Sequence, residues 1–110
     1  MATTPRMAQI EAMLADDPED AFLRYGLAME HASAGDDAAC AAVLQDLIAR
    51  KAADPYIPAY LQAGQALARI DRTGEACDVL RAGIDAARRV GTPEAMHAHG
   101  EMQGLLSSLE

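Results

Sequence analysis

The sequence predicts an all-α fold, in which about six antiparallel helices stack as a short right-handed solenoid. Alanine, the residue with the highest helix propensity, supplies 25 of the 110 residues. Residues that start and stop helices recur along the whole chain, at intervals of about 36 to 38 residues. β-branched residues are too few to build a sizeable sheet.

Large apolar residues are scarce, which limits the kind of core that we expect. Leu, Ile, Val and Phe together number 20, and the net charge is -8, a combination that also occurs in disordered chains. Alanine favours a thin core of closely packed helices, with partial disorder as the alternative. The length indicates a single domain, residues 1–110. No apolar run approaches the roughly 20 residues that cross a bilayer, so a membrane span is excluded.

The first predicted helix spans residues 4–17. Thr4 is a suitable N-cap, and Pro5 stands at the first helical position, where proline is favoured. Apolar residues follow at helical spacing and form one face: Met7, Ile10, Met13 and Leu14. Asp16 and the following Asp-Pro pair end this helix.

Residues 20–53 are predicted to form a helical hairpin. Asp20 caps its first helix, which is apolar on nearly all sides, as expected of a buried helix, and which ends at Gly35. The second helix begins near Asp37 and ends before Asp54. Its apolar residues are Cys40, Val43, Leu44, Leu47 and Ile48.

A second hairpin is predicted over residues 57–90, and residues 92–109 form a C-terminal capping helix. Thr73 lies at the start of the second helix of this hairpin, and Gly91 ends it. Thr92 and the proline that follows it begin the last helix. The connections are short, so helices that are neighbours in sequence should pack antiparallel.

The positions of these boundaries repeat. Asp17-Pro18, Asp54-Pro55 and Thr92-Pro93 lie 37 and 38 residues apart. The helix that begins near Asp37 and the helix that begins near Thr73 superimpose at an offset of 36, with apolar residues at matching positions. A period of this length that contains two helices is typical of a helical solenoid.

Residues 57–90 resemble the tetratricopeptide repeat (TPR), whose pattern is Trp-x2-Leu-Gly-x2-Tyr, then Ala-x3-Phe and a closing proline. The matching residues read Tyr60-x2-Ala63-Gly64-x2-Leu67 and Ala76-x3-Leu80. Arg88 stands where the pattern has proline. The resemblance implies that small residues at Ala63, Gly64 and Ala76 let two helices approach closely, while larger residues fill the layer between hairpins.

The copy before this one fits the pattern in two registers. An offset of 36 gives Arg24-x2-Leu27-Ala28-x2-His31, and an offset of 38 gives Phe22-x2-Tyr25-Gly26-x2-Met29. The second register places aromatic residues better but needs a longer turn. A third half-copy reads Met96-x2-His99-Gly100-x2-Gln103.

The TPR resemblance implies a concave binding face, lined by the first helix of each repeat. Nine residues would form this groove: Phe22, Tyr25, Met29, Leu61, Gln65, Arg69, Glu94, His97 and Glu101. The alternative for Phe22, Tyr25 and Met29 is a place in the core. Aromatic and methionine side chains suit an apolar helix or an extended peptide as the partner.

Other kinds of site are weakly indicated. Glu94, His97 and Glu101 share one helical face and could hold a metal ion, but no second ligand cluster accompanies them, so a solvated face is expected instead. Cys40 and Cys77 lack a redox motif and are expected to be buried thiols. We expect no catalytic residues, no cofactor and no metal.

The sequence therefore predicts a non-enzymatic module for protein–protein interaction, with a self-associating scaffold as the alternative. The acidic balance disfavours a nucleic-acid partner. Two cysteines and the absence of an N-terminal signal peptide favour a cytoplasmic location.

Overall fold

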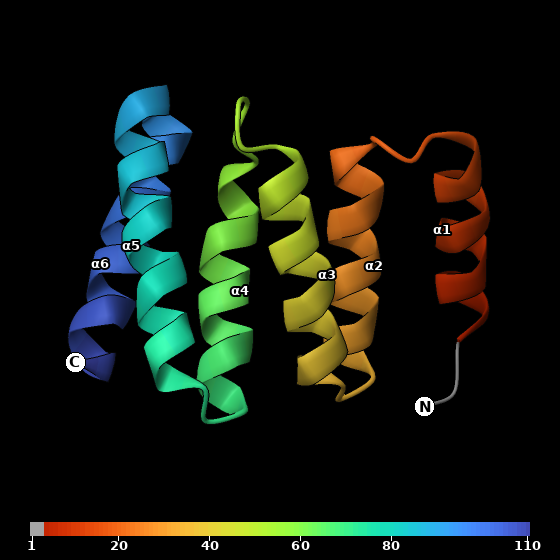
Figure 1. The fold of residues 1–110 in the computed structure, drawn as a ribbon, viewed down its shortest axis with the longest axis horizontal. Coiled ribbons are helices and arrows are strands. Elements are labelled where there is room, and N and C mark those ends of the chain that lie inside the picture. Colours follow the sequence, from red (N-terminus) through yellow and green to blue (C-terminus); the bar gives the residue numbers. More distant parts are fainter. Residues whose placement is uncertain (1–3) are drawn as a thin grey trace.

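A computed structural model describes residues 4–110, which form six α-helices and no strand, so the all-α prediction is confirmed (Figure 1). The helices lie side by side in chain order across the molecule, which measures 37 × 29 × 19 Å. Their bounds are α1 Pro5–Asp16, α2 Ala21–Ser33, α3 Asp37–Arg50, α4 Ile57–Arg69, α5 Thr73–Val90 and α6 Pro93–Leu109. None of these six helices is both long and apolar enough to cross a membrane.

Side-chain caps set the start of several helices, as the sequence predicts. The Thr4 hydroxyl oxygen accepts a hydrogen bond from the backbone N–H of Met7 at 3.1 Å, and Thr92 does the same for α6. The Asp20 carboxylate accepts from the backbone N–H of Leu23 at 3.0 Å. These oxygens bond to N–H groups that have no partner within the helix, and each cap contributes about 1 kcal/mol.

The helix starts settle the repeat register in favour of the offset of 36. The first helices α2, α4 and α6 begin at Ala21, Ile57 and Pro93, and the second helices α3 and α5 also begin 36 residues apart. Gly35 and Asp71 occupy matching places in the two turns, and both have positive φ, 81° and 62°. The turns therefore have equal lengths, and the longer turn that an offset of 38 requires does not exist.

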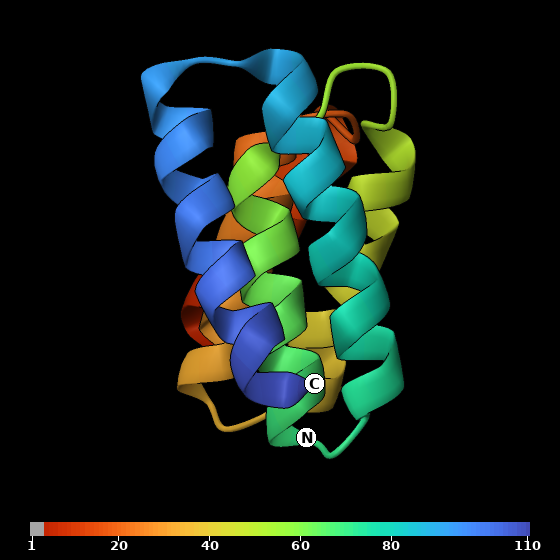
Figure 2. The same ribbon diagram turned by 90° about the vertical axis from the view of Figure 1, so that its left-hand side faces the viewer.

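The helices form two layers. α2, α4 and α6 lie on one side of the stack, and α3 and α5 lie on the other (Figure 2). Each helix packs against the next one in sequence, and α4 also contacts α6 directly. α1 packs against α2 at the opposite end of the molecule from α6.

Alanine builds much of the core, which explains its abundance. Nine of the 22 buried apolar residues in residues 4–110 are alanines. Tyr60, Leu67 and Leu80 fill the spaces that the alanines leave, and each is at most 5% exposed. The sequence expectation of a thin core with close helix approach is therefore correct.

Two glycines mark the closest approaches. A Cβ atom added to Gly64 would lie 2.6 Å from Cδ2 of Leu80, which connects α4 to α5. A Cβ atom on Gly83 would lie 2.5 Å from both Sδ of Met102 and Cβ of Tyr60, at the junction of α4, α5 and α6. Gly26 in α2 differs, because its added Cβ would meet nothing nearer than Ile10 at 3.9 Å.

Alanine substitutions at these glycines should have opposite effects. We expect Gly83→Ala to lower the free energy of unfolding by about 1–3 kcal/mol, since Cβ of Tyr60 cannot move without its backbone. Gly26→Ala has room and should raise that free energy by about 0.5–1 kcal/mol, because alanine restricts the unfolded chain and favours the helix. Urea denaturation followed by circular dichroism measures both. Equal effects of the two variants would contradict the close-contact account.

The left-handed conformation of Asp71 provides a second test. A non-glycine residue in this region carries a penalty of about 1–2 kcal/mol, which aspartate tolerates better than a β-branched residue does. Asp71→Val should therefore unfold at lower urea concentration than Asp71→Gly, by about 1–2 kcal/mol in the free energy of unfolding. Valine and glycine at Asp54, an exposed turn residue outside the left-handed region, serve as the control pair. A valine–glycine difference of the same size at both positions would refute the assignment.

Candidate functional site

The nine residues predicted for the groove all lie on α2, α4 and α6, the layer of first helices. We refer to this set as the first-helix face. The common interval of 36 residues gives Tyr25, Leu61 and His97 the same place in their respective helices, and likewise Met29, Gln65 and Glu101. Each helix therefore contributes residues at matching turns to one side of the stack.

Phe22 is an exposed apolar residue of this face. Its exposed fraction is 72%, so the core alternative is wrong for this side chain. Tyr25 and Met29 are half-buried and pack against the core cluster formed by α2, α3 and α4. For these two residues the core alternative is therefore partly correct, and α2 is much less buried than its apolar sequence suggests, with Ala28 its only buried residue.

Tyr25 connects two first helices. Its ring centroid lies 5.4 Å from that of Tyr56, next to α4, with the planes tilted by 49°. Burial, with a smaller contribution from the neighbouring Tyr56 hydroxyl, raises the pKa of Tyr25 above its ordinary value. Tyr25 thus helps to hold α2 against α4, and its removal would disturb the fold as well as the face.

The α4 part of the face is mostly neutral. Leu61 and Gln65 are half-buried. Nε of Arg69 lies 2.9 Å from Oδ1 of Asp37 at the start of α3, so this arginine is not a free cation on the face. Arg69 was predicted as a groove residue, and the ion pair shows that its charge is largely balanced within the chain.

The α6 part of the face is exposed and acidic. Glu94, His97 and Glu101 are all exposed, and Nε2 of His97 lies 3.5 Å from Oε1 of Glu101, one turn away. Within residues 4–110, no three His, Cys, Asp or Glu side chains gather as metal ligands would. The arrangement fits the solvated-face interpretation, in which residues four apart pair along the helix.

Both cysteines are buried, as predicted, and within residues 4–110 they form no disulfide. Cys40 is fully buried in α3 at the place that Ala76 occupies in α5. Burial raises the pKa of the Cys40 thiol, which keeps it protonated and unreactive at neutral pH.

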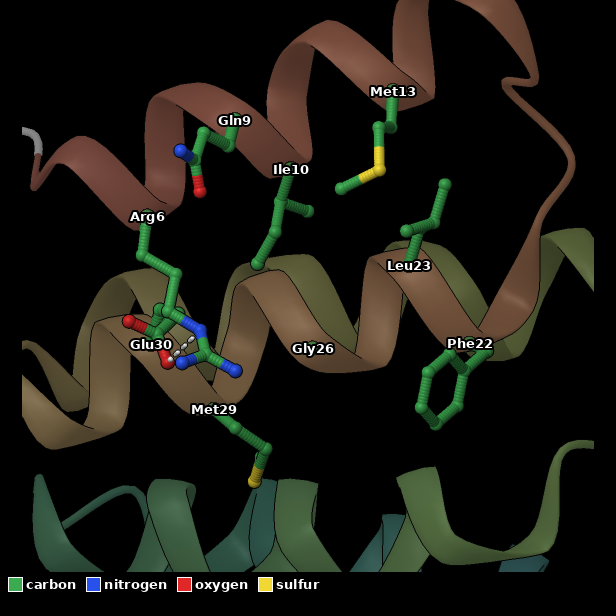
Figure 3. A pocket seen from close by; sticks show the side chains of 9 residues that line it. All are labelled: Arg6, Gln9, Ile10, Met13, Phe22, Leu23, Gly26, Met29 and Glu30. Carbon is green, nitrogen blue, oxygen red and sulfur yellow. Dashed lines mark ion pairs between the residues drawn. The ribbon is translucent and has the colours of Figure 1, made fainter.

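The sequence analysis missed a cleft between α1 and α2, with a volume of about 390 Å³ (Figure 3). We refer to it as the α1–α2 cleft. Ile10 and Met13 project into it from α1, Gly26 forms part of its α2 wall, and Phe22 and Met29 project from α2 on the side away from α1. Met13 was expected on the buried face of its helix, but it is 48% exposed at the edge of this cleft.

One end of the cleft is closed by an ion pair. Nε of Arg6 lies 3.5 Å from Oε2 of Glu30, across the gap between the two helices. The pair is largely exposed on the arginine side, so it contributes little to stability. The signal in the sequence was a glycine inside a helix, which marks a close contact with Leu80 at Gly64 and a looser contact with Ile10 at Gly26.

Comparison with solved structures identifies the family of this chain. No family model and no curated protein matches the chain. It is similar to a tetratricopeptide repeat domain protein from Salinibacter ruber, whose solution NMR structure matches with 35% identity and a TM-score of 0.71, covering 86% of this chain and 90% of that one. A crystal structure of such a domain from the same organism matches with 32% identity and a TM-score of 0.68, covering 82% and 94%. This chain belongs to the tetratricopeptide repeat family.

Proposed function

We propose that this protein is a non-enzymatic module that binds a segment of another protein along the first-helix face. Membership of the tetratricopeptide repeat family supports protein partners in general, and in this family the layer of first helices forms the concave side of the solenoid. The exposure of Phe22 carries the proposal for this chain. An aromatic ring that is 72% exposed is unusual in a small domain with one phenylalanine, and aromatic residues are enriched where proteins bind one another.

The composition of the face indicates what kind of segment would bind. Its α2 end offers apolar surface at Phe22 and Met29, while its α6 end offers the carboxylates of Glu94 and Glu101. A partner segment with apolar anchors near one end and no excess of negative charge fits this gradient. The net charge of -8 disfavours a nucleic acid, whose phosphates the face would repel.

Self-association through the apolar part of the face is the alternative function, and no feature of the described residues favours it over a different partner. A second copy would bring another eight negative charges to the contact. The cytoplasmic location and the absence of catalytic activity stay predictions.

Site-specific photocross-linking tests the proposed face. We expect p-benzoylphenylalanine at Glu101, an exposed residue of α6 on the first-helix face, to capture a defined protein partner in lysate of the source cells. The same photoreactive residue at Ala82, exposed on α5 in the other layer, serves as the matched control and should capture that partner at least tenfold less. Quantitative mass spectrometry measures the adducts.

Two outcomes would contradict the proposal. Equal capture at both positions would mean that the partner does not distinguish the two layers. Capture of only a second copy at Glu101, together with a dimer mass in light scattering at micromolar concentration, would replace the proposed function with the self-association alternative.

A further inference from the structure

The α1–α2 cleft lies where the repeat geometry would place another helix. α6 packs against both helices of the hairpin before it, α5 and α4. Its inward side chains are closed off there, with Ala95 and Met102 at most 3% exposed. At the other end of the stack, α1 packs against α2 as α5 packs against α6. Within residues 4–110, however, no helix occupies beside α2 the position that α4 occupies beside α6.

Leu23 and Glu30 of α2 correspond to those buried residues of α6, whereas Gly26 corresponds to Ala98, which is half-buried. An offset of 72, twice the repeat interval, aligns Leu23, Gly26 and Glu30 with Ala95, Ala98 and Met102. Leu23, Gly26 and Glu30 are only half-buried, and the first two line the open cleft with Ile10 and Met13. The surface that α4 covers on α6 is therefore open at the corresponding place on α2. A further helix would fit this open surface.

The apolar contents of the cleft indicate which side of that helix faces inward. Met13 and Phe22, 48% and 72% exposed, flank the same end of the cleft. Gly26 presents no side chain to the cleft, and an added Cβ would lie 3.9 Å from Cδ1 of Ile10, so a partner side chain that enters the cleft would pack beside Ile10. The volume of about 390 Å³ is in the range of pockets that enclose a ligand, which suits apolar anchors at helical spacing.

The charge at that end indicates what flanks the anchors. Residues 16–20, between Met13 and Phe22, contain four carboxylates in five positions. Asp20 caps α2, and Glu19 pairs with Arg50 at 2.8 Å, whereas Asp16 and Asp17 are exposed and form no ion pair among the described residues. The C-terminal end of α1 adds partial negative charge there.

We propose that the α1–α2 cleft is a docking site for one amphipathic helix of a partner protein, whose apolar side chains enter the cleft beside Ile10 and Met13 and whose Lys or Arg residues face Asp16 and Asp17. The proposal rests on the proposed function, because it too needs a protein partner, but it names an adjoining surface, which shares Phe22 and Met29 with the first-helix face, and the chemistry of the partner. A second copy of this acidic chain lacks the required charge complementarity.

A fluorescence assay on the full chain tests this docking site. The protein contains no tryptophan, so Phe22→Trp creates a single reporter at the edge of the cleft. The probe is a synthetic amphipathic helix of leucine and lysine, and the matched peptide has glutamate in place of lysine. We expect the leucine–lysine peptide to shift the tryptophan emission to shorter wavelength in a saturable titration, with an affinity at least tenfold higher than that of the glutamate peptide.

Variants of the reporter protein locate the binding. Gly26→Leu fills the cleft and should weaken binding at least tenfold, whereas Gly100→Leu, at an exposed helical glycine of α6 with no atom within 4 Å of its added Cβ, should leave it unchanged. Circular dichroism confirms that both variants fold. Because Asp16 and Asp17 are exposed, their joint change to lysine should keep the fold and reverse the preference toward the glutamate peptide.

Three results would overturn the docking site. The first is equal weakening by Gly26→Leu and Gly100→Leu. The second is loss of binding on Glu101→Lys but not on the double change at Asp16 and Asp17, which would move the peptide to the first-helix face and support the proposed function alone. The third is a dimer that Gly26→Leu converts to a monomer, which would make a second copy the occupant. If instead cross-linking at Glu101 captures no partner while the peptide results hold, the cleft stands and the first-helix face fails.

Discussion

The close approach of α4, α5 and α6 is the constraint on which the remaining structure depends. Gly64 lets Leu80 reach the backbone of α4, and Gly83 lets Tyr60 and Met102 meet against α5. At Gly64 and Gly83 the helices are so close that one added methyl group would clash. Such close packing leaves space for few large side chains in the core, and those present are enclosed. Alanine can form most of the remaining core because close helices leave little space to fill. The abundance of alanine and the scarcity of leucine are thus two consequences of one geometry.

The same constraint explains why the two ends of the molecule differ. At the α6 end, Met102 packs between α4 and α5, and its exposed fraction is 0%. At the α1 end no equivalent three-helix contact exists among residues 4–110, because α1 packs on α2 and an added Cβ at Gly26 would meet nothing nearer than Ile10 at 3.9 Å. Apolar side chains that would be enclosed by a third helix stay exposed there. A repeat structure therefore creates a surface suited to a helix wherever the stacking pattern is not continued.

Much of the fold could be predicted from the sequence, because its determinants are local. Thr4, Asp20 and Thr92 act as caps through hydrogen bonds that span three residues, and such signals can be recognised without a structure. The register of the first copy could not be chosen, since Phe22 and Gly26 match the first aromatic and the glycine of the pattern, while the true register puts Arg24 and His31 at its two aromatic places. The cleft could not be predicted either. Met13 has the helical spacing of a core residue, and Gly26 resembles Gly64 until the distance to the neighbouring helix is known.

The distribution of charge links the fold to the kind of partner. Seven of the eight arginines in residues 4–110 form an ion pair, including Arg24 with Asp46 and Arg69 with Asp37. Such exposed pairs add little to stability, yet they cancel nearly all of the positive charge locally. The negative charge that remains is carried by carboxylates that form no ion pair among the described residues, including Asp16 and Asp17 beside the cleft and Glu94 on α6. Because Asp16 and Asp17 stand next to exposed apolar side chains at the α1–α2 end, the charge and the apolar surface there both favour the proposed partner, a helix that is apolar on one side and basic on its flanks.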